Sequence, residues 1–528
     1  MVEERPSSFL AILAIRKNEY HDFLDHVAET LTVKGLTHLC PRVYKMFVGR
    51  SLCADHLIRF GMALFLPSKE NPTRRVDMEK TDVLVIGGSA SGIVASTTGK
   101  CHYPDKDILL IRKEKKALVP CGIPYIFGSL ESSDKDVVGD NVLTDAGVRF
   151  VVDEVMSVDL DKKVCKTKEG RDISFEKLIF ATGSRPVIPK WLKGAELENV
   201  FTIPKDKEYL DNMLAKLDGL KNIVVIGGGF IGVELSDELN KKDKDVTIVE
   251  ILPHILGRAF DEEIAIEAEN VLGSRGVNIK TGKGVKELSG DKKVEAVILQ
   301  NGERLDADAV ILSMGYTPNT AIAAEAGLDL NSLGFIRVDE YMRTRNPGVF
   351  AVGDCAEKRD FITRRVSGAM LASIACTEAK IAGMNLYKLS TLKTFNGTIA
   401  IFSTVIGDTG LGSAGLNEAN AKREGFDVLT GTFTGVDKHP GTLPGTHKQI
   451  VKLIAARESG VVLGGEVIAG PSAGELTNII GLIIQAKMTI NNILTSQIGT
   501  HPLLTGPPTA YSIIKAAEEL MRCRDGKL

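Results

Sequence analysis

One cysteine of this chain stands in a setting that suits redox chemistry. Cys121 lies between Pro120 and Pro124 in the run LVPCGIPY, residues 118–125. Each proline fixes its own φ and biases the preceding residue toward an extended conformation, so the loop holds the sulfur with little freedom. A free cysteine is more often kept for its reactivity than for its packing. We therefore interpret Cys121 as a group that transfers electrons, and the other seven cysteines as structural residues.

A glycine-rich turn upstream of this loop has the pattern of a dinucleotide-binding motif. The apolar run Asp82–Ile86 predicts a buried strand, the turn follows directly, and a helix-compatible run begins at Ile93. In such a unit, glycines let the backbone approach a pyrophosphate at the N-terminus of the helix. The candidate binding residues are Gly87, Gly88, Ser89 and Gly92. The next strand, Asp107–Ile111, ends at Arg112 instead of the usual ribose-binding acid, and Glu114 is the candidate for that role.

A second motif of this kind is complete. The strand predicted at Asn222–Ile226 leads into three glycines, and the following strand ends at Glu250. The glycines are Gly227, Gly229 and Gly232. An acid at the end of the second strand binds a ribose 2′-hydroxyl and repels a 2′-phosphate. The motif therefore predicts NADH rather than NADPH as the nucleotide.

Two further polar turns come directly after apolar strands. Thr182 and Gly183 follow one of these strands. Gly353 and Asp354 follow the other. Asp354 is well placed to accept hydrogen bonds from sugar hydroxyls, and its alternative role is that of an ordinary turn or helix cap. Because two dinucleotide motifs precede it, we favour the cofactor-binding role.

Composition indicates a multidomain protein with no special affinity for polyanions. The 528 residues are 44% hydrophobic and 25% charged, with a net charge of −3. This length exceeds what one hydrophobic core supports, and the charge balance predicts neither nucleic acid nor a membrane surface as partner. No apolar run has the length of a membrane span, and Glu3 and Glu4 stand where a signal peptide needs positive charge. Scattered cysteines without a CxxC pair fit a reducing compartment, so we expect a cytoplasmic protein.

Taken together, these motifs resemble the FAD- and NAD-dependent pyridine nucleotide-disulfide oxidoreductase superfamily. The run around Cys121 resembles its single-cysteine branch, the coenzyme A disulfide reductases and NADH-dependent persulfide reductases. Ile126 stands where the two-cysteine branch has its second cysteine, which excludes the two-cysteine mechanism. The resemblance implies an α/β fold of two Rossmann-like domains, one for FAD and one for NAD, and a C-terminal α+β dimerisation domain. It also implies a homodimer.

The resemblance assigns roles to the candidate residues. The first glycine turn, Glu114, Thr182, Gly183, Gly353 and Asp354 would hold FAD, and the second motif with Glu250 would hold NADH. Phe230 takes the place of an aromatic residue that covers the flavin until nicotinamide enters. Glu234 matches an acid that approaches the nicotinamide–flavin region. The alternative for both is a structural one, helix packing for Phe230 and a solvated helix charge for Glu234.

The implied reaction passes electrons from NADH through flavin and Cys121 to a disulfide, persulfide or polysulfide. Coenzyme A disulfide reductases carry arginines on the helix after the first glycine turn, whereas residues 96–100 here contain only Lys100 as a cation. Fewer cations favour small persulfides or polysulfides over coenzyme A compounds. Two alternatives stay open. One is an NADH oxidase or peroxidase that reduces oxygen or peroxide through a cysteine sulfenic acid, and the other is a flavoprotein that reduces a protein electron carrier.

The C-terminal segment carries two candidates for a site shared across the dimer. His501 precedes Pro502, as in the two-cysteine reductases, but Gly506 replaces the acid that orients the histidine there. Tyr511 is the other candidate, because tyrosines of the partner face the substrate sulfur in the single-cysteine branch. Their alternative roles are to cap a turn and to pack the interface. We expect at least one of them at the partner's Cys121.

These motifs divide the chain into five parts. Residues 1–77 are either an upstream extension or a small accessory domain, and the pattern changes at Met78. We expect the remaining parts in this order: the first part of the FAD-binding domain at 78–186, the NAD-binding domain at 187–315, the second FAD-binding part at 316–391 and the dimerisation domain at 392–528.

Overall fold

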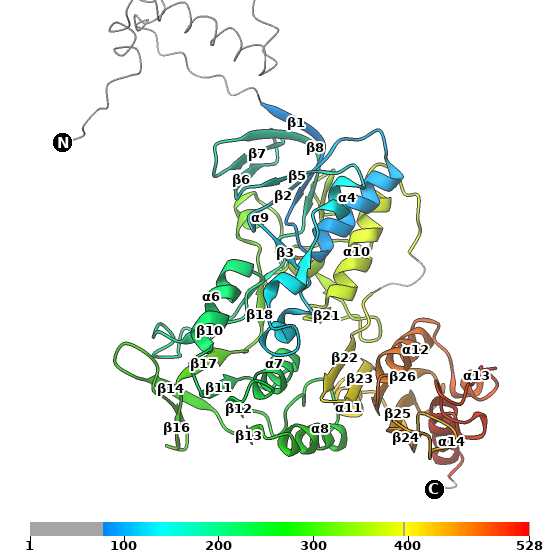
Figure 1. Ribbon diagram of the computed structural model, residues 1–528. Coiled ribbons are helices and arrows are strands. Elements are labelled where there is room, and N and C mark those ends of the chain that lie inside the picture. Colours follow the sequence, from blue (N-terminus) through cyan, green and yellow to red (C-terminus); the bar gives the residue numbers. More distant parts are fainter. Residues whose placement is uncertain (1–77, 394–396, 527–528) are drawn as a thin grey trace, which may run out of the picture. The chain divides into compact units, whose positions relative to one another are not determined.

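The computed structural model describes residues 78–393 and 397–526 (Figure 1). The described residues belong to one compact unit, residues 76–528. The question of an extension or an accessory domain at residues 1–77 lies outside the described residues. No helix within the described ranges is both long and apolar enough to cross a membrane.

The first sheet has a parallel centre and takes strands from two distant parts of the chain. Its spatial order is β5 (Arg149–Val152), β2 (Ile108–Arg112), β1 (Glu79–Ile86), β8 (Asp172–Phe180), β7 (Val164–Thr167) and β6 (Val155–Asp159). Strand β19 (Val349–Ala351) also pairs with β8, in parallel. Helices α4 (Ala90–His102) and α10 (Ala372–Met384) lie side by side against this sheet (Figure 1). A strand that begins at residue 349 thus completes the first sheet.

The second sheet is fully parallel. Its order is β10 (Val200–Thr202), β17 (Ala309–Leu312), β11 (Asn222–Ile226), β12 (Asp245–Val249) and β13 (Asn278–Lys280). Three helices accompany it, namely α6 (Lys207–Leu217), α7 (Phe230–Asn240) and α8 (Glu262–Ser274). A small antiparallel sheet of β14 (Val285–Ser289), β15 (Ala296–Leu299) and β16 (Arg304–Asp306) is attached. Both large sheets have buried central strands, as parallel sheets require.

The C-terminal domain is built on an antiparallel sheet. Its order is β22 (Ile401–Ile406), β23 (Thr409–Gly415), β26 (Val462–Ala469), β25 (Lys448–Ala456) and β24 (Val428–Val436). Helices α12 (Ala473–Gln485), α13 (Ile490–Leu494) and α14 (Ser512–Arg524) complete the domain, and α12 and α14 pack on the sheet. The sequence did not predict β23, because its glycines have low strand propensity.

The loop that carries Cys121 belongs to a segment of residues 117–138, here called the cysteine segment. Strands β3 (Ala117–Leu118) and β4 (Val137–Val138) close it by pairing. Two short 3-10 helices lie between them, η2 (Ile123–Phe127) and η3 (Ser133–Asp136). The apolar residues of η2 are buried in the same core cluster as the apolar residues of α6 and α7. The cysteine segment therefore follows the first glycine turn in the sequence but packs against the second sheet's helices.

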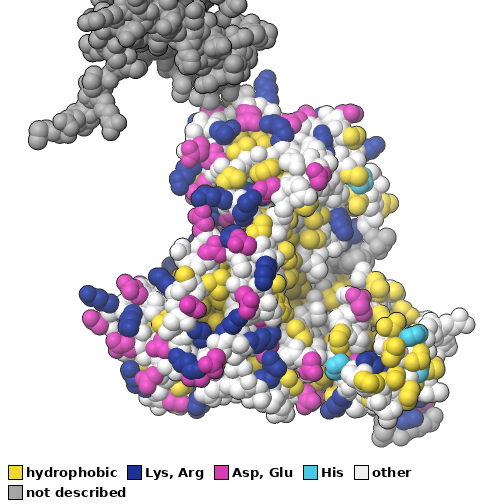
Figure 2. Space-filling model, viewed as in Figure 1, with side chains coloured by type: hydrophobic (Ala, Val, Ile, Leu, Met, Phe, Trp, Pro, Cys, Tyr) yellow, Lys and Arg dark blue, Asp and Glu magenta, His cyan; other side chains and the backbone are white. Residues whose placement is uncertain are grey.

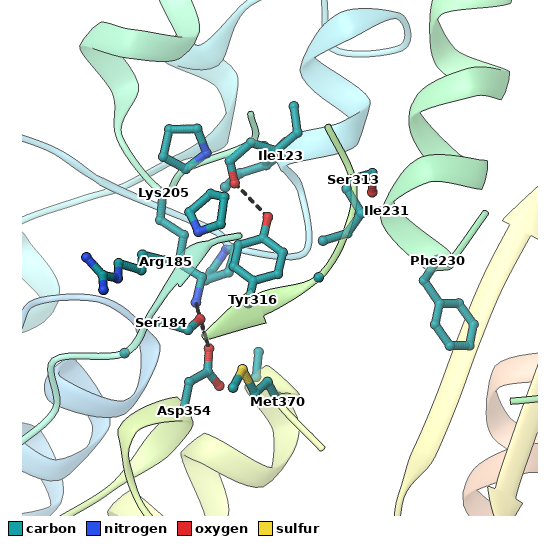
Figure 3. Close-up of a pocket in the computed structure, with 18 of the residues that line it drawn as sticks. Ile123, Ser184, Arg185, Lys205, Phe230, Ile231, Ser313, Tyr316, Asp354 and Met370 are labelled. Atoms are coloured by element: carbon teal, nitrogen blue, oxygen red, sulfur yellow. Dashed lines mark hydrogen bonds and ion pairs between the residues drawn. The ribbon is translucent and has the colours of Figure 1, made fainter. Parts of the chain in front are cut away.

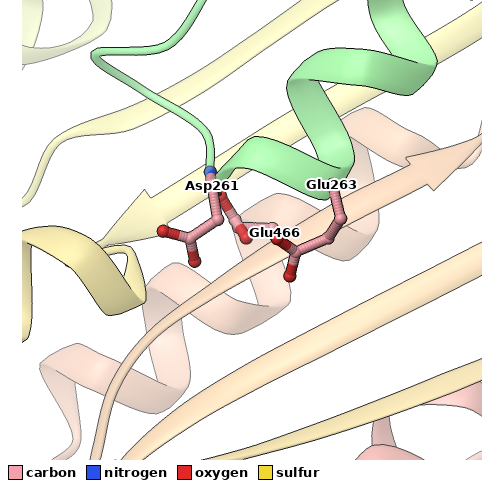
Figure 4. A group of neighbouring side chains, drawn as sticks. All are labelled: Asp261, Glu263 and Glu466. Atoms are coloured by element: carbon pink, nitrogen blue, oxygen red, sulfur yellow. Dashed lines mark hydrogen bonds between the residues drawn. The ribbon is translucent and has the colours of Figure 1, made fainter.

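A cluster of acids joins the second sheet's domain to the C-terminal domain. Figure 4 shows Asp261 and Glu263, at the start of α8, facing Glu466 of β26. The buried ammonium group of Lys452 lies among them, 2.9 Å from Asp261 Oδ2 and 2.5 Å from Glu263 Oε1. Burial raises the pKa of Glu466 well above its usual value. Lys452 supplies the positive charge here, and the cluster joins domains.

Candidate functional site

One cleft of about 1230 Å³ brings together the predicted cysteine and both glycine-rich turns. Cys121, the turn that begins at Gly87 and the turn that begins at Gly227 all line it. The turns follow β1 and β11, so the cleft lies at the carboxyl ends of two parallel sheets, where open α/β sheets bind ligands. Glu114, Thr182, Gly183, Glu250 and Asp354 also line the cleft.

The two glycine turns have nearly the same geometry. Gly87 and Gly227 adopt φ values of +115° and +110°, and a Cβ atom at either would collide with a backbone carbonyl of the adjacent strand end. At Gly92 and Gly232, an added Cβ would lie 1.9 Å from the carbonyl oxygen of the turn's first glycine. Neither α4 nor α7 has a side-chain cap at its N-terminus. The free N–H groups and the missing Cβ atoms fit one dinucleotide pyrophosphate at each helix.

The acids expected at the two riboses differ in their surroundings. Both oxygens of Glu250 accept backbone hydrogen bonds, from Gly228 N at 2.6 Å and from Leu252 N at 2.8 Å. These bonds hold the carboxylate at the edge of the cleft. In the first motif, the buried Arg112 lies against Gly88, as Glu250 lies against Gly228. Glu114 lines the cleft, and burial raises its pKa. Its role at a ribose stays a prediction.

Asp354 makes an ion pair inside the cleft (Figure 3). Its Oδ2 atom accepts a hydrogen bond from Ser184 Oγ at 2.7 Å and lies 2.8 Å from Lys205 Nζ. Burial alone would raise the pKa of Asp354, but Lys205 and Ser184 lower it, so the group is ionised at neutral pH. No sequence signal points to Lys205, because it lies outside any motif, between β10 and α6. The turn itself is fixed because Gly353 N donates to the buried Glu378 Oε2 at 2.9 Å.

Helix α7 places two predicted residues at the boundary with the C-terminal domain. The Phe230 ring stacks on Phe402 of β22, with 5.1 Å between ring centroids, and in Figure 3 it lies well apart from the Asp354 group. Glu234 Oε1 accepts a hydrogen bond from Thr404 Oγ1 at 2.8 Å. Burial raises the pKa of Glu234 to about 7. A flavin-covering role for Phe230 stays a prediction.

The charges around Cys121 oppose ionisation of its thiol. The residue is exposed to the open cleft, but the cleft walls still desolvate it and raise the pKa of the thiol. The carboxylates of Glu234 and Asp354 raise this pKa further, whereas the ammonium group of Lys205 lowers it. Lys205 thus counteracts both acids at the sulfur.

The two C-terminal candidates lie apart from the cleft of their own chain, and neither lines it. His501 is exposed, and its Nδ1 atom accepts a hydrogen bond from Leu503 N at 3.2 Å. Tyr511 precedes α14 and packs against the core of the C-terminal domain, where burial raises its pKa. Their placement at the site of a partner stays a prediction.

The chain is similar to known flavin-dependent redox enzymes. A family model described as pyridine nucleotide-disulphide oxidoreductase matches residues 81–379, and the model of the family's dimerisation domain matches residues 401–510. An NADH oxidase of Methanocaldococcus jannaschii is 29% identical over 83% of this chain and 98% of its own length. An NAD(P)H coenzyme A polysulfide/persulfide reductase of Pyrococcus horikoshii is 30% identical over 74% and 87%.

A solved structure supports the same relationship. The NAD-dependent persulfide reductase from A. fulgidus superposes with a TM-score of 0.79 at 28% identity, covering 84% of each chain. The matches confirm the predicted fold class, two dinucleotide-binding domains with a C-terminal dimerisation domain. Since the first family model covers more than half of the sequence, the chain belongs to the pyridine nucleotide-disulphide oxidoreductase family.

Proposed function

We propose that this chain is an FAD-dependent oxidoreductase that passes electrons from NADH to a disulfide, persulfide or polysulfide through Cys121. The observation that supports this most strongly is that Cys121 lines the same cleft as both dinucleotide cradles. The family and the two persulfide reductases among the relatives point the same way. FAD supplies the hydride-accepting and electron-transferring chemistry when it is bound.

The chain's own residues bind and orient the reactants. The N-termini of α4 and α7 would bind the two pyrophosphates, and Glu250 would accept from the ribose of NADH. Asp354 is held in place by Ser184 and is ionised, so it can accept from sugar hydroxyls.

Cys121 would act as the nucleophile toward sulfur. Its thiolate attacks the outer sulfur of a persulfide R–S–SH, the S–S bond breaks, and R–S⁻ leaves while Cys121 becomes a persulfide. Two electrons and one proton, supplied as the hydride of NADH, then convert this persulfide to the Cys121 thiolate and H₂S.

The acceptor we propose is a small persulfide or polysulfide. Lys100 is the cation of α4 closest in sequence to the first glycine turn, and its Nζ atom donates to Pro104 O and to Lys106 O, each at 2.8 Å. These bonds fasten it to its own loop. Without a free ammonium group there, α4 offers no clamp for the phosphates of coenzyme A.

A second candidate function is an NADH oxidase. Its specific support is the relative of that name from Methanocaldococcus jannaschii, which matches 83% of this chain. Cys121, exposed at the cleft, would then cycle through a sulfenic acid. A reductase of a protein electron carrier, the third hypothesis, needs no cysteine, and alkylation of Cys121 separates it from both.

We further propose that the active unit is a homodimer in the cytoplasm. The C-terminal residues match a dimerisation domain. Exposed leucines gather there, including Leu482, Leu503 and Leu504, and Figure 2 shows hydrophobic and histidine side chains together on this domain. His501 and Tyr511 flank the last two leucines in sequence, which supports their proposed place beside the partner's Cys121. The scattered free thiols fit a reducing compartment.

Replacing the proposed nucleophile separates the two halves of the reaction. Cys121→Ser leaves both dinucleotide-binding turns unchanged. We therefore expect the variant to bind FAD, and we expect NADH to reduce the bound flavin as fast as in wild type. Its turnover of polysulfide is expected to fall by more than ~100-fold, because serine is a far weaker nucleophile at neutral pH. Anaerobic NADH consumption measures this. Undiminished turnover would remove Cys121 from the mechanism.

The nucleotide preference tests the role of Glu250. In Glu250→Ala, the KM for NADH is expected to rise by about tenfold, the equivalent of roughly 1.4 kcal/mol for a lost ribose hydrogen bond. The KM for NADPH should fall, because the carboxylate no longer repels the 2′-phosphate. Steady-state kinetics with both nucleotides give the answer. A wild-type enzyme that prefers NADPH would contradict the assignment.

Glu234 offers a test of the charges at Cys121. Glu234→Gln removes a negative charge that raises the pKa of the thiol, so the midpoint of Cys121 alkylation should move down by about 0.5–1 pH unit. The effect is confined to pH values above about 7, where Glu234 is ionised. Iodoacetamide labelling of the FAD-loaded enzyme across pH measures the midpoint. An upward shift or none would show that Glu234 does not act on the thiol.

A further inference from the structure

A buried carboxylate on α7 holds the cysteine segment. Glu238 Oε2 accepts a hydrogen bond from Ser129 N at 2.5 Å, and Oε1 accepts one from Ser129 Oγ at 3.0 Å. Lys241 Nζ lies 2.5 Å from Oε1 and balances the charge. The Glu238 side chain is 1% exposed. Hydrogen bonds to a buried charge are stronger than neutral ones, so this contact is a firm attachment between two distant parts of the chain.

The backbone of the segment lies directly on the helix at this point. A Cβ atom at Gly128 would be 2.4 Å from Glu238 Oε2 and 2.5 Å from the Glu238 carbonyl oxygen. Only glycine permits this approach. An exposed ion pair between Glu131 and Lys242 lies next to it, at the surface. The middle of the cysteine segment, at Gly128 and Ser129, is thus fixed by Glu238 and by the missing side chain of Gly128.

A short buried turn connects the Glu238 contact to Cys121. This turn, η2, lies between Cys121 and Gly128, and its apolar side chains are buried. Glu234 and Glu238 are four residues apart and therefore lie on one face of α7. The first of these carboxylates acts on the Cys121 thiol, and the second holds Ser129. A single helix thus carries the nucleotide cradle, an acid that acts on the thiol, and the attachment of the segment that bears it.

We propose that Glu238 is a positioning residue for Cys121, which holds the cysteine segment on α7 and so sets the place of the thiol in the cleft. This inference rests on the proposed redox role of Cys121. It gives the nucleotide-binding helix direct control over the position of the reacting sulfur. A displacement of about 1 Å at a reacting atom is enough to cost ~100-fold in rate.

Release of the attachment should change the chemistry of the thiol. The groups that act on it are Glu234 of α7, Asp354 after β19, Lys205 before α6 and Cys376 of α10. The charge of Glu238 raises the pKa of Glu234, so its loss leaves Glu234 more ionised. By itself this would raise the pKa of the thiol, which is opposite to the shift expected from release of the segment. In Glu238→Ala, the segment can move away from α7, so Cys121 becomes better solvated and more distant from Glu234. We expect the midpoint of its alkylation to fall by about 0.5 pH unit or more. We also expect the acceptor step to slow at least tenfold while reduction by NADH is unchanged.

Three further variants make the test specific. Glu238→Gln keeps the shape and one acceptor for Ser129 N, so it should restore most of the wild-type profile. Ser129→Ala removes the two hydrogen bonds of the hydroxyl, which donates to Glu238 Oε1 and accepts from Lys241 Nζ, and it keeps the backbone bond to Glu238. A smaller shift of the labelling midpoint in the same direction is expected. Lys242→Ala breaks the neighbouring exposed ion pair with Glu131 and serves as the matched control. We expect it to leave the midpoint of Cys121 alkylation unchanged. All are full-length enzymes loaded with FAD.

Iodoacetamide labelling against pH, thermal melting and stopped-flow kinetics together decide the outcome. Lower melting temperatures with an unchanged labelling profile would assign Glu238 a purely structural role and overturn the proposal. The proposal is also overturned if Glu238→Ala does not fold and Ser129→Ala labels like wild type. Labelling requires no acceptor. A shifted profile in an enzyme whose wild type reduces no sulfur compound would therefore refute the proposed function and uphold the positioning role.

Discussion

The cleft depends on one packing contact, the burial of the cysteine segment against α6 and α7. Ile123, Ile126 and Phe127 belong to a single core cluster with the apolar residues of those helices. Full burial of a side chain of this size contributes roughly 1.5–3 kcal/mol, so three of them hold the segment firmly. The loop with Cys121 follows the first sheet in sequence, yet this contact fixes it relative to the helix of the second nucleotide motif. The sulfur and both cradles can share one cleft for that reason.

Helix α7 extends this arrangement to the C-terminal domain. Phe230 stacks on Phe402, and Glu234 binds Thr404, both on strand β22. The family's dimerisation domain is thus in direct contact with the helix that forms the nucleotide cradle.

The charges in the cleft affect the ionisation of the Cys121 thiol. Glu234 and Asp354 favour a neutral Cys121 thiol, and Lys205 is the cation that acts against them. Glu234 and Asp354 therefore make ionisation of the Cys121 thiol less favourable.

The features that the sequence predicts correctly are those that depend on residues close together in the chain. Both strand–glycine–helix units can be recognised directly, because only glycine tolerates the positive φ at Gly87 and Gly227. Cys121 stands out by its flanking prolines. Lys205 and Glu238 carry no such signal, because their roles arise from contacts with Asp354 and Ser129, far away in the chain. The packing of the cysteine segment against the second sheet's helices likewise depends on contacts between distant residues. Strand β23 has no clear sequence signal, because glycines have low strand propensity.

The central claim is that Cys121 delivers electrons to sulfur, and the rate at which candidate acceptors reoxidise the enzyme tests it most directly. The FAD-loaded enzyme is reduced anaerobically with one equivalent of NADH and mixed in a stopped-flow instrument with inorganic polysulfide, a small persulfide, coenzyme A disulfide or oxygen. The return of flavin absorbance gives each rate. We expect polysulfide and the small persulfide to reoxidise the flavin fastest, and oxygen to do so slowest. Oxygen as the fastest acceptor, with sulfur compounds inert, would contradict it.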